Sequence, residues 1–385
     1  MADPEVSWYN LLSKEAAMRV LRIAARNIVL IGLITVVLAL GAPQAQAVTE
    51  GDVRGWAEEA LTALLNRYWN DFLSTFNSRY PCTDTSCYDF NYWWQAHAID
   101  ALLDGYVLTG DEKYLEYMDR LRHGVLQRNG FVLYNHFYDD MEWMALALLR
   151  AYNLTDDTLY LEDAKKLFND IIRGWMPEGG IAWNKDHQSV NACSNGPAAI
   201  LAARLYRATG DETYLDWAKK IFAWLDETLV DPRTFLVLDN LHLSTKQIDR
   251  RTFTYNQGTY IGAAVELYEL TGDEAYLEKA QRTARSALVY HGDRTGVFIQ
   301  ERGQGDGGLF KGIMVRYMVE LLRVAPEMTE LRDALVANAA SVSEVRRDDG
   351  LFGPRWRGAP HVGTVDLSTH LSAVMLFALT APLAD

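Results

Sequence analysis

The chain has 385 residues, of which 51 are acidic and 37 are basic, so its formal net charge at pH 7 is −14. This acidic balance argues against nucleic acids and anionic membrane surfaces as partners, because both carry negative charge themselves. Neutral or cationic ligands are compatible with it.

The first 47 residues have the three parts of a secretory signal peptide. Its basic region contains Lys14, Arg19, Arg22 and Arg26. The apolar run 28–40 is short for a transmembrane helix, which needs about 20 residues, and Ala45-Gln46-Ala47 supplies a small-residue cleavage pattern. We therefore predict cleavage after Ala47 and a secreted protein, extracellular or periplasmic, without stable membrane association. Because the basic region is unusually long, an uncleaved anchor is the alternative.

Residues 48–385 are predicted to form one domain, because no Pro-, Ser- or Gly-rich linker divides them. Cys82 and Cys87 flank a four-residue loop segment, and export would permit a disulfide between them. A metal site would need further Cys or His ligands nearby, so we predict the disulfide and no metal. Cys193 is left over and is expected to be buried and inert. The apolar run 371–383 lacks the polar spacer of a lipid-anchor signal and is interpreted as a core helix.

A self-similar phrase recurs along the chain and indicates a helical repeat. It reads LTGDEKYL at 108–115, ATGDETYL at 208–215 and LTGDEAYL at 270–277, with a degenerate copy, LTDDTLYL, at 154–161. Gly is typical of the residue that follows a helix, and Asp is a favoured first cap of the next one. Each phrase therefore predicts a tight hairpin between two helices.

The hydrophobic periodicity around these phrases predicts an all-α fold with about twelve helices. The expected ranges are 53–76, 91–109, 111–128, 139–153, 157–174, 191–209, 211–229, 256–271, 273–289, 308–324, 329–344 and 364–380. No stretch shows the alternation of a long strand, apart from short pieces such as 235–238. Twelve helices in six hairpins predict an (α/α)6 barrel. Every second helix, starting with 91–109, is small and apolar enough for the inner ring.

The connections between the predicted helices are asymmetric, and this asymmetry places a site. Links from an inner to an outer helix are the tight hairpins. Links from an outer to an inner helix are long and comprise residues 77–90, 129–138, 175–190, 230–255, 290–307 and 345–363. All six must gather on one face, at the start of the inner helices. Long loops on a rigid scaffold commonly carry binding and catalysis.

Two adjacent carboxylates, Asp139 and Asp140, begin the predicted helix 139–153 on that face. Acids in a first helical turn are often only caps, which is the structural alternative. Cleavage of a glycosidic bond needs two carboxyl groups, about 5–5.5 Å apart for retention of configuration and about 6.5–9.5 Å apart for inversion. Successive helical residues point about 100° apart, so both can face one sugar only if Asp139 lies just outside the helix, in the cap position, where we expect it. Their closeness would then favour retention.

Aromatic and amide side chains accompany the acids at the entries to the inner helices and predict a pocket for a neutral polyol such as a carbohydrate. Aromatic residues more often belong to a core, and Asn often caps a helix. His97 is more typical of a core histidine than of a catalyst. The candidate substrate-binding residues are Tyr92, Trp93, Trp94, Gln95, His97, Tyr138, Trp183, Asn191, Asn195, Tyr255, Asn256, Gln257, Phe310 and Lys311.

Six of these segments together resemble glycoside hydrolase family 76, the endo-α-1,6-mannanases and their fungal cell-wall relatives. They are 92–97 (YWWQAH), 138–140 (YDD), 179–181 (GGI), 195–198 (NGPA), 254–258 (TYNQG) and 310–312 (FKG). The resemblance, from about residue 55 to 380, implies an (α/α)6 barrel and retaining cleavage of α-1,6-mannosidic bonds. It implies that Asp139 is the nucleophile and Asp140 the acid/base. It implies α-mannan or another mannose-containing glycan as substrate.

Three functional hypotheses follow, and none needs a cofactor. The first is a secreted, monomeric endo-α-1,6-mannan hydrolase. The second is a transglycosylase acting on mannose-containing cell-wall glycans; fungal relatives of that kind carry a C-terminal lipid-anchor signal, which this chain does not convincingly have. The third is a non-catalytic glycan-binding barrel in which the two acids only cap a helix. Enzymes with this barrel that act on uronic acids usually have cationic clefts. The only obvious candidates on the loop face here are Arg250, Arg251 and Lys311, which argues against such a substrate.

Overall fold

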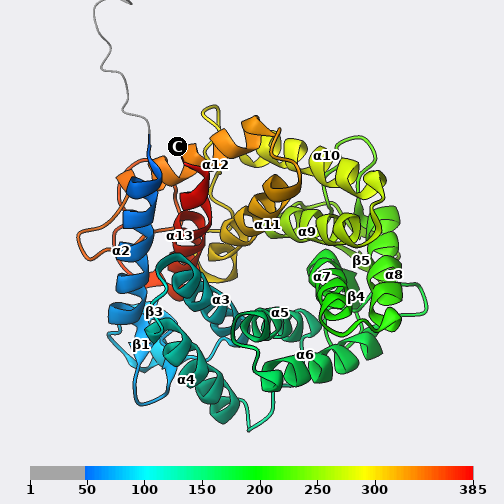
Figure 1. The fold of residues 1–385 in the computed structure, drawn as a ribbon, viewed down its shortest axis with the longest axis horizontal. Coiled ribbons are helices and arrows are strands. Elements are labelled where there is room, and N and C mark those ends of the chain that lie inside the picture. The colour runs from blue at the N-terminus through cyan, green and yellow to red at the C-terminus, as the bar shows by residue number, and fades with distance from the viewer. Residues whose placement is uncertain (1–47, 385) are drawn as a thin grey trace, which may run out of the picture. The chain divides into compact units, whose positions relative to one another are not determined.

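The computed structural model describes residues 48–384, so the predicted signal peptide lies outside the described residues. The described helices form two concentric rings (Figure 1). The outer ring contains α2 (Glu50–Tyr68), α4 (Lys113–Arg128), α6 (Thr158–Ile171), α8 (Glu212–Leu229), α10 (Glu274–His291) and α12 (Thr329–Glu344). The inner ring contains α3 (Tyr92–Thr109), α5 (Tyr138–Thr155), α7 (Ala192–Thr209), α9 (Thr254–Thr271), α11 (Phe310–Val324) and α13 (Leu367–Thr380). The predicted (α/α)6 barrel is confirmed.

The repeated phrase forms the hairpins for the reasons that its sequence suggests. Gly210 ends α7 in the left-handed conformation, with φ of 74°, which glycine adopts without a steric penalty. The next residue, Asp211, caps α8 by accepting a hydrogen bond from Thr213 N. In the degenerate copy Asp156 takes the left-handed position, with φ of 57°. Each inner helix is thereby turned back into its outer partner within a few residues.

Small residues allow the inner helices to approach one another closely. A side chain at Gly258 of α9 would meet the backbone of Met314 in α11, 2.6 Å from its Cα. A side chain at Gly262, one turn later, would collide with the Tyr317 ring. These two contacts explain why the inner helices are rich in small residues and why α9 and α11 pack side by side.

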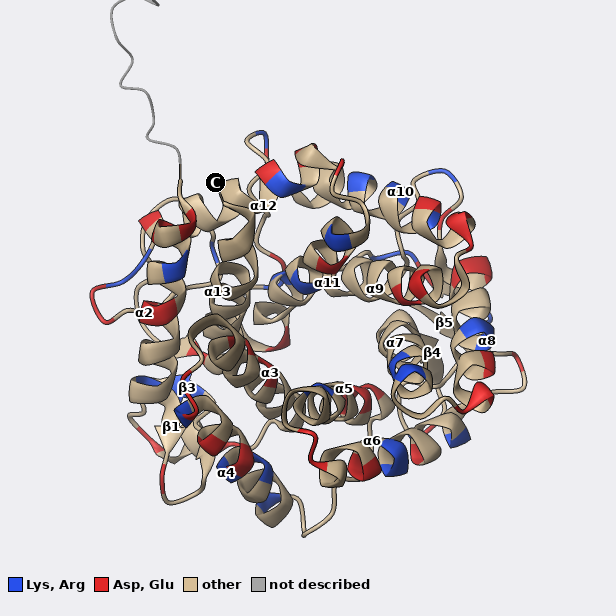
Figure 2. Cartoon of the chain, in the orientation of Figure 1, with Lys and Arg blue, Asp and Glu red and all other residues tan. Residues whose placement is uncertain are grey.

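Charged residues lie mainly on the outer helices (Figure 2), but the inner ring also holds buried ion pairs. Arg316 of α11 contacts Asp104 of α3 at 2.7 Å. Arg150 of α5 contacts the same carboxylate at 2.6 Å. Because the charges are shared between helices far apart in the sequence, they join α3, α5 and α11 inside the ring.

The strands are short and lie in the loops before inner helices. They are β1 (Trp69–Asn70), β2 (Thr75–Phe76), β3 (Arg79–Tyr80), β4 (Ser189–Asn191), β5 (Asn240–His242), β6 (Ile248–Asp249) and β7 (Val365–Asp366). β1 pairs with β2, β3 with β7, and β5 lies between β4 and β6, all antiparallel. In the three-stranded sheet Asn191 faces Asn240. This sheet joins the loops that precede α7 and α9.

Two expectations about the elements need correction. The predicted helix 53–76 ends at Tyr68, because residues 69–76 turn back as the β1–β2 hairpin. Residues 235–238 form no strand; only an isolated bridge joins Val237 to Val230. The run 371–383 contributes to α13 and the short 3-10 helix η4 (Ala381–Leu383), and α13 lies in the inner ring. Within residues 48–384, no helix is both long and apolar enough to cross a membrane.

Candidate active site

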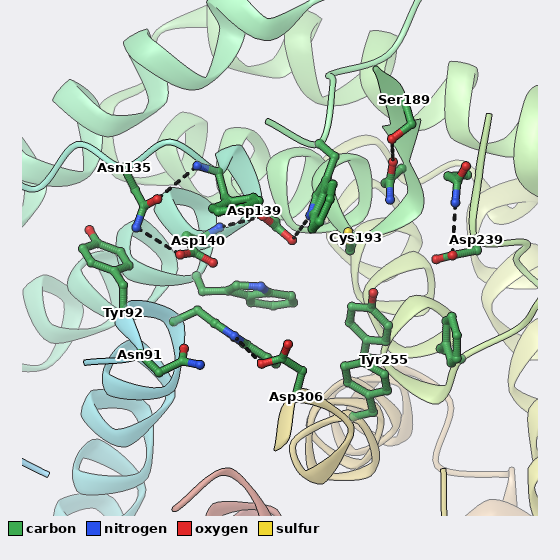
Figure 3. Close-up of a pocket in the computed structure, with 18 of the residues that line it drawn as sticks. Asn91, Tyr92, Asn135, Asp139, Asp140, Ser189, Cys193, Asp239, Tyr255 and Asp306 are labelled. Atoms are coloured by element: carbon green, nitrogen blue, oxygen red, sulfur yellow. Dashed lines mark hydrogen bonds between the residues drawn. The ribbon is translucent and has the colours of Figure 1, made fainter. Parts of the chain in front are cut away.

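A cavity of ≈750 Å³ opens where the inner helices begin, on the loop face that the sequence predicted. Five of the six long loops line it, and the loop before α13 does not. Asp139 and Asp140 lie on one wall, Asp239 faces them across the space, and Asp306 and Tyr255 complete the ring (Figure 3).

The two adjacent aspartates occupy the first turn of α5. The helix begins at Tyr138, and Phe137 is the extended residue before it. The expectation that Asp139 lies outside the helix is therefore wrong. The loop before α7 occupies the capping region instead, because the Tyr138 N–H donates to the Trp183 carbonyl at 3.0 Å. Both carboxylates still line the cavity, since the helix starts at its wall.

Asp139 is surrounded by hydrogen-bond donors. Trp183 donates its indole N–H to Oδ2 at 3.1 Å, and the Asp140 backbone N–H donates to Oδ1 at 3.1 Å. Burial raises the pKa of Asp139 to about 7, and hydrogen bonds from the Cys193 thiol, Trp183 and the Asp140 backbone oppose that rise. Donors to a carboxylate stabilise its anionic form, so Asp139 is equipped to carry a negative charge.

Asp140 has the opposite environment. Its one side-chain donor within residues 48–384 is Asn135, whose Nδ2 lies 3.0 Å from Oδ2. Burial raises the pKa of Asp140 well above its usual range, and the negative charges of Asp139 and Asp306 raise it further. Of the two neighbours, Asp140 therefore has the surroundings that favour a protonated carboxyl group, which a general acid needs.

Aromatic rings form apolar surfaces on the cavity wall. Tyr255 and Phe310 are stacked, with ring centroids 4.0 Å apart and an interplanar angle of 11°. Trp183 keeps 39% of its surface exposed, and Trp93 and Trp143 also line the space. Flat rings beside hydrogen-bonding groups suit a sugar, which presents apolar faces and hydroxyl edges.

The wall opposite Asp140 is polar. Asp239 Oδ2 accepts from Asn240 at 3.1 Å and from Arg251 at 3.3 Å. Ser189 Oγ donates to Asn191 Oδ1 at 2.6 Å. The side-chain nitrogen of Asn191, a residue that lines the cavity, is not used in this hydrogen bond. This wall offers donors and acceptors for hydroxyl groups and carries one carboxylate that Arg251 balances.

Three predicted substrate-binding amides bind the backbone instead. Gln95 bonds both the N–H and the carbonyl of Phe76 at 3.0 Å. Asn195 does the same with Ile181, at 2.8 and 3.0 Å. Gln257 does so with Val237, at 2.8 and 2.9 Å. All three side chains are fully buried. We call them the amide clamps; each fastens a long loop to the first turn of an inner helix.

Five other predicted binding residues lie outside the cavity lining. The Trp94, Tyr138 and Asn256 side chains are buried behind the wall. His97 packs between aromatic rings, and burial lowers its pKa to about 3. Lys311 donates from Nζ to the Pro354 carbonyl at 2.9 Å, and burial lowers its pKa to about 7. The remaining predicted residues, Tyr92, Trp93, Trp183, Asn191, Tyr255 and Phe310, line the cavity with Asp139 and Asp140.

The sequence reasoning missed several lining residues. They include Phe90, Asn91, Asn135, Trp143, Gln188, Ser189, Asp239, Asn240, His242, Arg302 and Asp306. Cys193 is buried as expected, and it lies beside Asp139 at the cavity (Figure 3). Burial raises the pKa of its thiol well above the usual range. For Asp306, the signal was a single acid in a glycine-rich run, GQGDGG, just before an inner helix.

Two further expectations concern cysteines and metals. The structure joins Cys82 to Cys87 in a disulfide, with Cα atoms 5.4 Å apart. In the part of the chain from 48 to 384, no group of three or more His, Cys, Asp or Glu side chains is arranged to hold a metal ion.

The chain matches known proteins along most of its length. It is 44% identical to the α-1,6-mannanase GH76A of Salegentibacter sp. HEL1_6, whose structure superposes with a TM-score of 0.81 over 86% of this chain and all of that one. An inactive variant of that mannanase, with two adjacent aspartates changed to asparagine, was solved with α-1,6-mannotriose. The mannan endo-1,6-alpha-mannosidase DCW1 of Candida glabrata is 28% identical over 66% of this chain, and the match spans 64% of that protein.

The family model described as glycosyl hydrolase family 76 matches residues 53–383. This confirms the resemblance seen in the six sequence segments, and it covers nearly all of the barrel. The chain belongs to glycosyl hydrolase family 76.

Proposed function

We propose that the protein is a retaining endo-α-1,6-mannanase in which Asp139 is the nucleophile and Asp140 the acid/base. The observation that carries this proposal is the unequal pair at the cavity wall. Asp139 is held by donors, whereas Asp140 lies beside other carboxylates. The chain has two more adjacent aspartate pairs, 156–157 and 348–349, but neither lines this cavity. The inactive Salegentibacter variant also carries changes at two adjacent aspartates.

In the first half of the reaction a carboxylate oxygen of Asp139 attacks the anomeric carbon of a mannose residue. The bond from that carbon to the glycosidic oxygen breaks, and Asp140 gives its proton to the departing oxygen. The product is a glycosyl ester on Asp139 and a shortened mannan. The stored proton on Asp140 and the donors around Asp139 match these two roles.

In the second half a water molecule attacks the same carbon from the side that the leaving sugar occupied. Asp140, now ionised, takes a proton from the water, and Asp139 leaves as a carboxylate. Both groups return to their starting protonation states. Two inversions at one carbon give net retention of the α configuration.

Incubation of the purified protein with linear α-1,6-mannan tests this function. We expect a ladder of α-1,6-mannooligosaccharides and a loss of activity of at least about 100-fold in both Asp139→Asn and Asp140→Asn. The matched control is Asp156→Asn, also in an adjacent pair, at a left-handed position that Asn tolerates. Absence of products from the unmodified protein, with binding retained, would contradict the proposal. Products that are longer than the substrate would indicate transfer to another glycan in place of water.

We also propose export, with cleavage after Ala47. The basic region, the apolar run and the small-residue pattern support it, and so does the Cys82–Cys87 disulfide, which persists in oxidising compartments. Amino-terminal sequencing of the secreted protein should begin at Val48. A mature protein that still contains the run 28–40 would favour the anchor instead.

A further inference from the structure

Asp306 holds two consecutive tryptophans with one oxygen. The indole N–H groups of Trp93 and Trp94 both donate to its Oδ1, each at 3.1 Å. The other oxygen, Oδ2, has no hydrogen-bond partner among the described residues. Asp306 lines the cavity (Figure 3), so this second oxygen is available on the side of the substrate.

The convergence of the two rings on one atom is not a consequence of helix geometry alone. Side chains of consecutive helical residues point about 100° apart, yet both indole N–H groups reach the same oxygen of Asp306. Trp93 and Trp94 are the second and third residues of α3. Asp306 belongs to the 3-10 helix η3 (Gly305–Gly308), and its two hydrogen bonds join η3 to the start of α3.

The backbone fixes the place of Asp306. The Gly305 N–H donates to Asp366 Oδ2 at 2.8 Å, which fastens η3 to the start of α13. A side chain at Gly307 would lie 2.9 Å from the Glu301 carbonyl, and one at Gly308 would lie 2.4 Å from Thr369 Oγ1. The two glycines thus let η3 pack closely against the preceding loop and against α13. This packing fixes the position of the Asp306 carboxylate.

We propose that Asp306 is a positioning residue for the acid step: it fixes the Trp93–Trp94 pair at the cavity wall and presents its carboxylate to Asp140 across the cavity. This inference rests on the proposed function and adds a third carboxylate to it. Asp306 does not transfer the proton itself. It acts on the residue that does, through the space that the substrate enters.

The charges around Asp140 make Asp306 distinct. From α5, Asp139 and the buried Glu142 face it, and from α3 the hydroxyl of Tyr92 is close. The cationic groups of the cavity, Arg251, Arg302 and His242, come from the loops before α9 and α11. Asp306 comes from outside α5, and its charge disfavours ionisation of Asp140.

The consequence concerns the alkaline side of the pH profile. Asp140 must be protonated to donate, so activity is lost as the pH rises through its pKa. The charge of Asp306 raises that pKa. Removal of the charge should lower it and move the alkaline limb of kcat/KM to lower pH.

Four variants separate the charge from the hydrogen bonds. Asp306→Asn keeps an oxygen for both indoles and removes the charge. Trp94→Phe removes one indole donor and keeps the charge; Trp94 does not line the cavity. Asp89→Asn removes an exposed charge from another loop of the same face, outside the cavity lining. Asp306→Glu should restore the charge.

We expect the alkaline limb to move down by about half a pH unit in Asp306→Asn. It should stay in place in Trp94→Phe and Asp89→Asn and return upward in Asp306→Glu. The shift should shrink at high salt, because Asp306 is exposed to the cavity and its charge is screened there. An unmoved limb in Asp306→Asn, or an equal shift in Asp89→Asn, would overturn the inference. If Asp306→Asn does not fold, Asp306→Ser makes the same change in charge.

A measurement without turnover separates this inference from the proposed function. The titration of Asp140 can be followed by NMR of protein labelled with 13C at the aspartate carboxyl carbon, with Asp140→Asn to assign the signal. A lower pKa of Asp140 in Asp306→Asn supports the inference even if mannan is not cleaved. An unchanged pKa contradicts it even if mannan is cleaved.

Discussion

At the scale of single residues, the site consists of two neighbouring carboxyl groups with unequal surroundings. Both lie in the first turn of α5, where the helix dipole favours negative charge equally for each. The difference comes from other elements: Trp183 and Cys193 stabilise an anion at Asp139, whereas Asp306 disfavours one at Asp140. The proposed division of roles therefore depends on the loops and not on α5 alone.

The first prediction concerns the pH dependence of kcat/KM. Asp139 must be ionised, and its pKa is raised to about 7, so activity should fall as the pH drops below that value. Asp140 must be protonated, and burial and the neighbouring carboxylates raise its pKa well above its usual range, so activity should fall again at higher pH. We expect a bell-shaped profile whose maximum lies well above the pH range in which ordinary aspartates titrate, measured on mannooligosaccharides. A maximum near pH 4, where ordinary aspartates titrate, would contradict these environments.

The second prediction separates the two acids by the leaving group. An aryl α-mannoside with an acidic phenol as leaving group does not need protonation by the enzyme. Asp140→Asn should therefore retain its first chemical step on this substrate, seen as a burst of phenol, while its activity on mannan falls by at least about 100-fold. Asp139→Asn should show neither burst nor turnover. A burst from Asp139→Asn and none from Asp140→Asn would reverse the roles.

At the scale of elements, the amide clamps hold the loops that build the cavity. Each bonds the N–H and the carbonyl of one loop residue in place of a strand partner. The clamps stand four residues into α3, α7 and α9, at Gln95, Asn195 and Gln257. The same position in three inner helices thus has the same function: its amide side chain attaches a long loop to the helix.

The third prediction tests one clamp. Gln257→Leu preserves the approximate volume but leaves the Val237 N–H and carbonyl buried without partners. We expect a loss of about 1–3 kcal/mol in the free energy of unfolding, with an increase in KM because the loop before α9 carries Asp239. Gln127→Leu, the same change at an exposed position of α4, is the control. Equal losses in both variants, measured by denaturant titration, would contradict a clamp role.

The clamps also show what could be predicted from the sequence. The hairpins and rings followed from local signals, Gly and Asp at fixed places and helical periodicity. The substrate-binding residues could not be predicted in this way. An amide side chain at the start of a helix can bind a sugar or a loop backbone, and the sequence around Gln257 does not indicate which of the two it binds. Asp306 was missed for the converse reason: its importance arises from Trp93 and Trp94, more than 200 positions away.

At the scale of the whole molecule, buried ion pairs join inner helices that are far apart along the chain. Arg204 of α7 contacts Glu266 of α9 at 2.5 Å and Glu320 of α11 at 2.8 Å. Together with Arg316 and Asp104, which join α11 to α3, this arrangement connects opposite sides of the inner ring. The ring then presents its loops to the cavity as one rigid frame.

The fourth prediction concerns this frame. Arg204→Met leaves Glu266, with a side chain only 3% exposed, and Glu320 without their shared partner. We expect a loss toward the lower end of about 3–5 kcal/mol, because Arg207 still contacts Glu266. Arg207→Met, whose side chain is 46% exposed, should cost less than about 1 kcal/mol. Thermal and denaturant unfolding can compare the two, and the reverse order would contradict the account of the inner ring.

The measurement that tests the central claim most directly is the anomeric configuration of the first product. Proton NMR of α-1,6-mannan digested by the purified protein distinguishes new reducing ends before they equilibrate. Double displacement through Asp139 and Asp140 requires that α-anomers appear first and β-anomers only later, by mutarotation. If β-anomers appear first, water attacks the sugar directly, and Asp139 is not the nucleophile.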